Sequence, residues 1–84
     1  MDNVSIINDL NTIIDPEFYD LDVLTSVILR HLDHMRQKAP EELMNTLNIE
    51  LRCVHHEIRL GDGSYTEHCY NDCIDAVKAI VAYL

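Results

Sequence analysis

Apolar side chains recur at steps of three and four along most of this 84-residue chain, which is the spacing of one face of an α-helix. The clearest run is residues 20–38, DLDVLTSVILRHLDHMRQK, which predicts a helix of about five turns. Val23 and Leu29 fall outside its apolar stripe, so the apolar face is broader than one neighbour would cover. We therefore expect this helix to contact two other elements, or one element and a second copy of the chain. The stripe itself comprises Leu21, Leu24, Val27, Ile28, Leu32 and Met35.

Similar stripes predict three more helices. The first begins at Asp2 or Asn3, where a short polar side chain can cap it. It ends before Pro16, because a proline disfavours the α conformation in the residue before it. The third covers residues 40–59, and the fourth runs from residue 64 onward, after the glycines of a tight break. Their stripes comprise Val4, Ile7, Leu10 and Ile14, then Leu43, Leu47, Leu51, Val54 and Ile58, then Tyr70, Cys73, Val77, Ile80 and Leu84.

Four helical segments with short connections predict an all-α fold, a small antiparallel bundle of about four helices that forms a single domain over residues 1–84. The structural alternative is a β-hairpin across residues 61–63, because Ile58, Leu60 and Tyr65 could alternate between two faces. The apolar pattern on both sides of this turn has a helical period, which favours the helices.

The chain also carries more apolar side chains than a four-helix monomer of this length would bury. Ile6 and Ile13 lie beside the stripe of the first helix, and the fourth helix ends in the apolar run AIVAYL. An exposed apolar patch of more than a few hundred Å² usually marks an interface. The sequence therefore predicts a two-fold homodimer.

Charge narrows the range of partners. The chain holds 15 acidic and 6 basic residues, a net charge of −9 with neutral histidines. No basic residue precedes Arg30, and a second acidic stretch, with Asp62, Glu67, Asp72 and Asp75, ends at Lys78. If these two stretches meet in space, they form an acidic face. Such a chain is repelled by nucleic-acid phosphates and by anionic membranes, so we expect neither direct nucleic-acid binding nor membrane binding, and a protein partner with a basic surface instead.

The compartment is predicted from what the sequence does not contain. Three cysteines is an odd number, whereas a secreted disulfide scaffold usually has an even set. The first residues, MDNVSIIND, lack the basic and long apolar regions of a signal peptide. No run approaches the roughly 20 apolar residues that span a bilayer. We expect a cytoplasmic protein with reduced thiols.

A metal- or thiol-dependent regulatory protein is the alternative from another class. Cys53, His55, Cys69 and Cys73 are possible ligands of a soft or borderline metal. No pair has the tight spacing typical of zinc sites, and Cys73 lies on an apolar stripe, where a small core residue is expected. His31 is expected to pack half-buried. A pH switch at a dimer interface containing His31 or His55 is a further hypothesis.

Catalysis is not expected. The chain has no nucleophile elbow and no glycine-rich phosphate loop, and LGDGSYTE lacks the ligand spacing of a calcium-binding loop. A bundle of this size also has little room for a deep pocket. The sequence therefore predicts a protein that is not an enzyme and has no cofactor.

The leading hypothesis is a small acidic interaction protein, an inhibitor, adaptor or neutraliser that binds another protein and that could come from a phage or mobile element. Its face could compete for a basic or nucleic-acid-binding surface, in the extreme case by imitating a nucleic-acid backbone. Two aromatic residues would anchor the contact, because aromatic side chains often dominate interface energetics. The predicted contact residues are Asp9, Asp15, Glu17, Phe18, Tyr19, Asp20 and Asp22.

Overall fold

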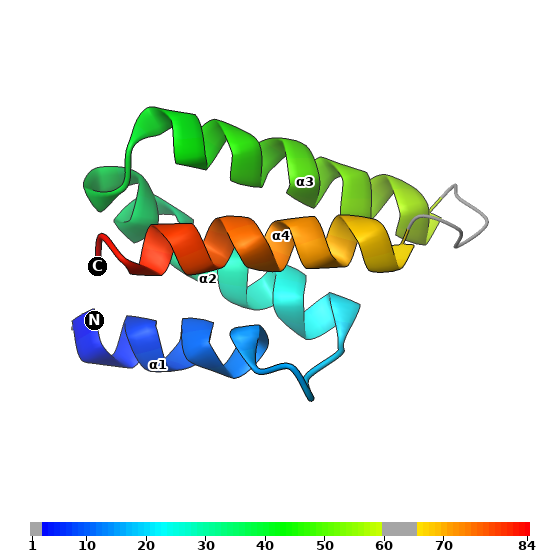
Figure 1. Cartoon of the computed structure of the whole chain (residues 1–84), viewed down its shortest axis with the longest axis horizontal. Helices are drawn as coiled ribbons and strands as arrows, with labels where there is room; N and C mark the ends of the chain where they lie inside the picture. The colour runs from blue at the N-terminus through cyan, green and yellow to red at the C-terminus, as the bar shows by residue number, and fades with distance from the viewer. Residues whose placement is uncertain (1–2, 60–65) are drawn as a thin grey trace.

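The computed structural model describes residues 3–59 and 66–84, which form four α-helices and contain no strand within those ranges. The helices are α1 (Asn3–Ile14), α2 (Leu21–Lys38), α3 (Glu41–Arg59) and α4 (Thr66–Val81). In Figure 1, α4 lies between α3 and α1, with α2 behind. The main contacts join α1 to α2, α2 to α3, α3 to α4 and α4 to α1. The prediction of an all-α helical bundle is confirmed.

One of the three residues on which the β-hairpin alternative depends lies in a helix. Ile58 belongs to α3, which continues to Arg59. Leu60, Tyr65 and the glycines at positions 61 and 63 lie outside the described residues. The hairpin is therefore not present in the part of the chain that the structure describes.

One apolar core runs through the middle of the bundle, and all four helices contribute to it. The predicted stripe of the fourth helix is confirmed at Tyr70, Cys73, Val77 and Ile80, which are all buried, whereas Leu84 is half-buried and lies after the end of α4. Full burial of a large aliphatic side chain contributes about 1.5–3 kcal/mol, so these positions stabilise the bundle. The largest fully buried side chains are Leu10, Ile13, Leu24, Ile28, Met35, Leu47, Ile80, Val54 and Val77, with Cys69 and Cys73.

The predicted face of α1 is wrong by about one residue. Ile6, Leu10 and Ile13 are buried, whereas Val4 is 66% exposed. Positions 6, 10 and 13 are also spaced by four and three, so they form an equally regular helical face. Ile6 and Ile13 are therefore not available for a dimer interface, because the four-helix core already covers them.

The end predicted for the first helix before Pro16 is confirmed, since α1 ends at Ile14. Asp20 is the N-cap of α2, and its carboxylate accepts a hydrogen bond of 3.0 Å from the backbone N–H of Val23. An N-cap of this kind typically stabilises a helix by about 1 kcal/mol. At the start of α3, the carbonyl of Pro40 accepts hydrogen bonds from the backbone N–H groups of Leu43 and Met44.

As predicted, α2 contacts two other elements, α1 and α3. Val23 and Leu29, outside its main stripe, remain exposed. Among the described residues, the other exposed large apolar side chains are those of Val4, Tyr19, Ile49 and Tyr83. They lie in α1, in the connection between α1 and α2, in α3 and after the end of α4, and such scattered exposure is normal for a monomer surface.

Candidate functional site

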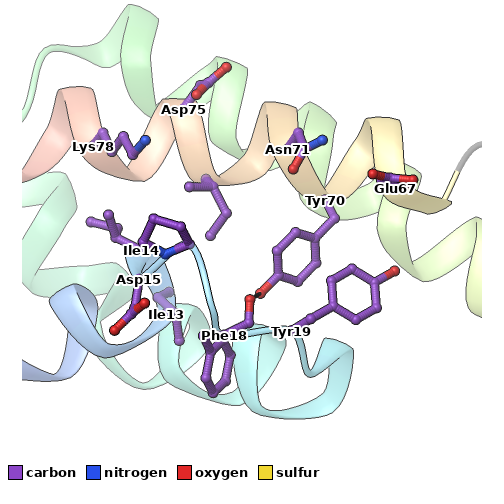
Figure 2. Close-up of a pocket in the computed structure, with 12 residues that line it drawn as sticks. Ile13, Ile14, Asp15, Phe18, Tyr19, Glu67, Tyr70, Asn71, Asp75 and Lys78 are labelled. Atoms are coloured by element: carbon purple, nitrogen blue, oxygen red, sulfur yellow. Dashed lines mark hydrogen bonds between the residues drawn. The ribbon is translucent and has the colours of Figure 1, made fainter.

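A groove of about 500 Å³ separates the connection between α1 and α2 from the first part of α4 (Figure 2). Apolar side chains form its floor and polar side chains form its rim. Because the connection is short, it holds its aromatic residues directly opposite α4. The groove is lined by Ile13, Ile14, Asp15, Pro16, Phe18, Tyr19, Glu67, Tyr70, Asn71, Ile74, Asp75 and Lys78.

The wall on the α1 side is a hydrogen-bonded turn. The backbone N–H of Phe18 donates to the carbonyl of Asp15 over 2.9 Å, and the N–H of Glu17 donates to the Asp15 carboxylate over 2.9 Å. An aspartate that accepts from the residue two positions later is a common turn-forming arrangement. Asp15 therefore has a structural role in addition to its charge.

The two walls are joined at Tyr70. Its hydroxyl donates to the backbone carbonyl of Phe18 over 3.2 Å, and its ring lies against the Tyr19 ring at a centroid distance of 4.5 Å (Figure 2). Burial raises the pKa of the Tyr70 hydroxyl above its ordinary value, so this hydroxyl stays a neutral donor at physiological pH. Tyr19, by contrast, is 57% exposed and presents an open aromatic surface beside the groove.

The rim is mainly acidic. Glu67, Asn71, Asp75 and Lys78 follow one another along α4 in Figure 2, at helical spacings of three and four. Asp15, which directly follows α1, lines the other wall. The lining thus holds three carboxylates and one amine, and it contains no histidine, serine or cysteine among the described residues. These groups are suited to binding a positively charged, partly apolar segment.

The two acidic stretches of the sequence do meet in space here. Asp15 belongs to the first stretch, and Glu67 and Asp75 belong to the second. The contact between α1 and α4 brings them to one groove. The charge pattern indicated this face in general terms, but Tyr70 was assigned only to the core. No local signal in the sequence shows that its hydroxyl reaches a backbone carbonyl 52 residues away.

The other predicted contact residues are divided between structural and surface roles. Asp9 binds a buried histidine of α2, and Asp20 caps α2. Phe18 is half-buried and packs against the core. Glu17 and Asp22 are exposed and lie outside the main groove, Glu17 at a shallow hollow on its outer side and Asp22 beside α3. Asp15 and Tyr19 therefore remain the predicted residues that both line the groove and are exposed.

The cysteines differ from the expectation of reduced thiols. Cys53 of α3 and Cys69 of α4 form a disulfide, with their Cα atoms 6.0 Å apart, and Cys73 is a buried free thiol. Two of the alternative metal ligands are therefore bonded to each other. Within residues 3–59 and 66–84 no three His, Cys, Asp or Glu side chains are grouped so that they could hold a metal ion. His55 is exposed.

Comparison with known proteins gives no relative. No protein-family model, curated protein or solved structure matches the chain significantly. Among the described helices, none combines the length and the hydropathy needed to cross a membrane.

Proposed function

We propose that this chain is a small acidic interaction protein without enzymatic activity, which binds a basic surface of another protein through the groove between α1, α2 and α4. The observation that carries the proposal is the convergence of two sequence-distant acidic stretches at one groove that also carries an exposed aromatic ring, that of Tyr19. Aromatic residues at the centre of a contact supply area at little entropic cost, and surrounding charges steer the encounter. A role as an inhibitor, an adaptor or a neutraliser of the partner is compatible with this mode of binding.

Several finer features stay predictions. They are the antiparallel order of neighbouring helices, the homodimer, the cytoplasmic location, the imitation of nucleic acid and an origin in a phage or mobile element. The dimer prediction has lost part of its basis, since Ile6 and Ile13 lie in the core. Native mass spectrometry of the untagged protein would give the number of subunits directly.

The test compares two triple variants of equal charge. The site variant carries Glu67→Gln and Asp75→Asn in the groove and Glu17→Gln in the adjoining hollow, which shares Asp15 and Phe18 with the groove. The control carries Asp33→Asn, Glu42→Gln and Glu50→Gln on α2 and α3. Each removes three charges from −9, which leaves −6. Asp15 and Asp20 stay unchanged because they hold the turn and the cap.

Proteins captured from a lysate by the unmodified chain would be identified, and each direct affinity would then be measured by calorimetry at two salt concentrations. We expect the site variant to bind at least tenfold more weakly, with a smaller salt dependence, while the control keeps most of the affinity. Equal loss in both variants would show that net charge alone is responsible and would reject the groove as the contact face. Failure of any basic protein to bind directly would reject the proposed function.

The redox-responsive alternative is favoured by one observation, the Cys53–Cys69 disulfide. Cys69 directly precedes Tyr70, so the bond ties the groove-lining part of α4 to α3. A reductant of the dithiol class would convert the disulfide to two thiols and itself become a disulfide, which would free this part of α4 from α3. Partner affinity measured before and after reduction distinguishes a regulatory bond from a purely structural one.

A further inference from the structure

We infer that the groove binds an arginine side chain of the partner, stacked on the Tyr19 ring and paired with the Glu67 carboxylate, with an apolar partner residue beside it on the isoleucine floor. This inference rests on the proposed function and names the chemistry of the partner segment. It is argued from the charge and shape of the groove.

The first step is the aromatic surface. Tyr70 uses its hydroxyl on the Phe18 carbonyl and lies 4.5 Å from Tyr19, centroid to centroid, which holds the Tyr19 ring in place while leaving 57% of that residue exposed. A fixed aromatic face attracts a cation, and arginine more often than lysine, because a planar guanidinium can also stack on the ring.

The second step is the arrangement of charge. Glu67 lies on α4 at the end with the two tyrosine rings, whereas Asp15 and Lys78 lie toward the other end of the lined surface (Figure 2). Carboxylates accept the paired N–H groups of a guanidinium in a fork geometry. Lys78 would repel a second cation at its end. The cation therefore belongs at the Tyr19 end of the groove.

The third step is the apolar floor. Ile13 and Ile74 are buried and Ile14 is half-buried, and all three line the groove. A volume of about 500 Å³ is large enough for more than one side chain. A segment with an arginine and a neighbouring branched apolar residue fits both the charge and the floor. A purely polybasic segment would leave the floor uncovered.

The test uses three synthetic peptides, each a capped hexapeptide with one leucine next to the varied position. That position is arginine, lysine or citrulline. Lysine keeps the charge without the planar group, and citrulline keeps the planar shape without the charge. Binding is followed by backbone amide NMR shifts of the whole chain in low salt, because weak binding still gives measurable shifts. We expect the arginine peptide to bind about three- to fivefold more tightly than the lysine peptide, and the citrulline peptide more weakly still.

Variants assign the contact. Tyr19→Leu should weaken binding of the arginine peptide about threefold and remove its advantage over lysine, whereas Tyr19→Phe should retain it. Lys78→Gln should tighten binding about twofold, because it removes the cation of the lining. The matched control is Tyr83→Leu, since Tyr83 is 52% exposed and lies outside the groove lining. It should change nothing.

The outcomes separate this inference from the proposed function. Equal binding of arginine and lysine peptides, with shifts spread over Asp33 and Glu42 as well, would overturn the arginine site and leave the acidic interaction protein standing. Shifts confined to the groove but unchanged in Tyr19→Leu would overturn the stacking. Absence of binding by all three peptides would overturn the inference, while the triple variants still decide the proposed function.

Discussion

The carboxylate of Asp9 on α1 and the imidazole of His31 on α2 form a hydrogen bond of 2.7 Å, in which Nε2–H donates to Oδ2. His31 is only 3% exposed, so this nitrogen has little access to water. Arg30 lies 3.9 Å from the same carboxylate oxygen but is largely exposed, and exposed ion pairs contribute about 0–1 kcal/mol. The histidine contact is therefore the stronger link between the two helices.

Replacing Asp9 alone should destabilise the bundle. In Asp9→Ala the buried Nε2–H of His31 loses its acceptor, and a buried polar group without a partner costs about 1–3 kcal/mol. Chemical denaturation followed by circular dichroism would measure the free energy of unfolding. His31→Leu is the comparison, because an apolar side chain of similar size leaves no buried donor.

The double variant Asp9→Ala/His31→Leu completes the cycle. If the hydrogen bond carries the effect, the double variant should be more stable than Asp9→Ala alone, since replacing both partners removes the orphaned group. Additive losses in the two single variants would show that Asp9 and His31 act independently. Arg30→Gln controls for the exposed ion pair and should change the stability by less than about 1 kcal/mol.

Reduction of the Cys53–Cys69 disulfide should also lower the stability. The bond joins residues 16 positions apart, and a loop of about 15 residues is worth about 3 kcal/mol through the restricted unfolded chain. For a domain of this size, a loss of that magnitude lowers the melting temperature by roughly 10 °C or more. Differential scanning calorimetry with and without a phosphine reductant measures the shift. The double variant Cys53→Ala/Cys69→Ala should melt at the lower temperature in both conditions, and a large reductant effect in that variant would contradict the assignment.

Cys73 should make the fold sensitive to alkaline pH. Burial, followed by the charges of Glu50 and Asp72, raises the pKa of its thiol from 9.0 to about 12. Below pH 9 both the folded and the unfolded chain hold this proton, so the thiol does not lower the free energy of unfolding there. Between pH 9 and 12 the unfolded chain releases it while the folded chain retains it, so stability should fall by up to about 1.4 kcal/mol per pH unit.

The measurement is urea unfolding at pH 8, 9, 10 and 10.5, with short incubations to limit disulfide exchange. Cys73→Ala should show a smaller decline above pH 9, although its stability at pH 8 is lower because of the cavity that it creates. Part of the decline above pH 10 should remain in the variant, since the pKa of Tyr70 is also raised by burial. Parallel declines in the two proteins would show that Cys73 does not cause the alkaline loss.

Local signals in the sequence were sufficient for the helices and for the end of α1. The stripe of α4 and the end of α1 before Pro16 follow from spacing and side-chain chemistry within a few residues of the chain. The face of α1 did not follow from spacing, because both sets of apolar positions fit a helix. Contact with α2 and α4 decides that Ile6 and Ile13, rather than Val4, face the core.

The site was predictable only in its charge. The exposed carboxylates and Tyr19 were expected, but the hydrogen bond of Tyr70 to Phe18 and the contact of Asp9 with His31 join residues 52 and 22 positions apart. Such pairings depend on how the helices are placed in space. The sequence predicted reduced thiols, and the pairing of Cys53 with Cys69 also depends on how α3 and α4 are placed in space. Spacing alone does not distinguish Cys69 from Cys73, because the two lie one helical turn apart on the same side of α4.

The Cys53–Cys69 bond also makes the chain a closed ring over residues 53–69. A protease that cuts one peptide bond between those cysteines would leave two pieces still joined by sulfur. The nicked molecule would gain the mass of one water and separate into fragments only under reducing conditions. A cut after α3 and before α4 opens the ring without dividing the core, because α1 and α2 remain on one piece with α3 while α4 stays attached to α3 through the disulfide.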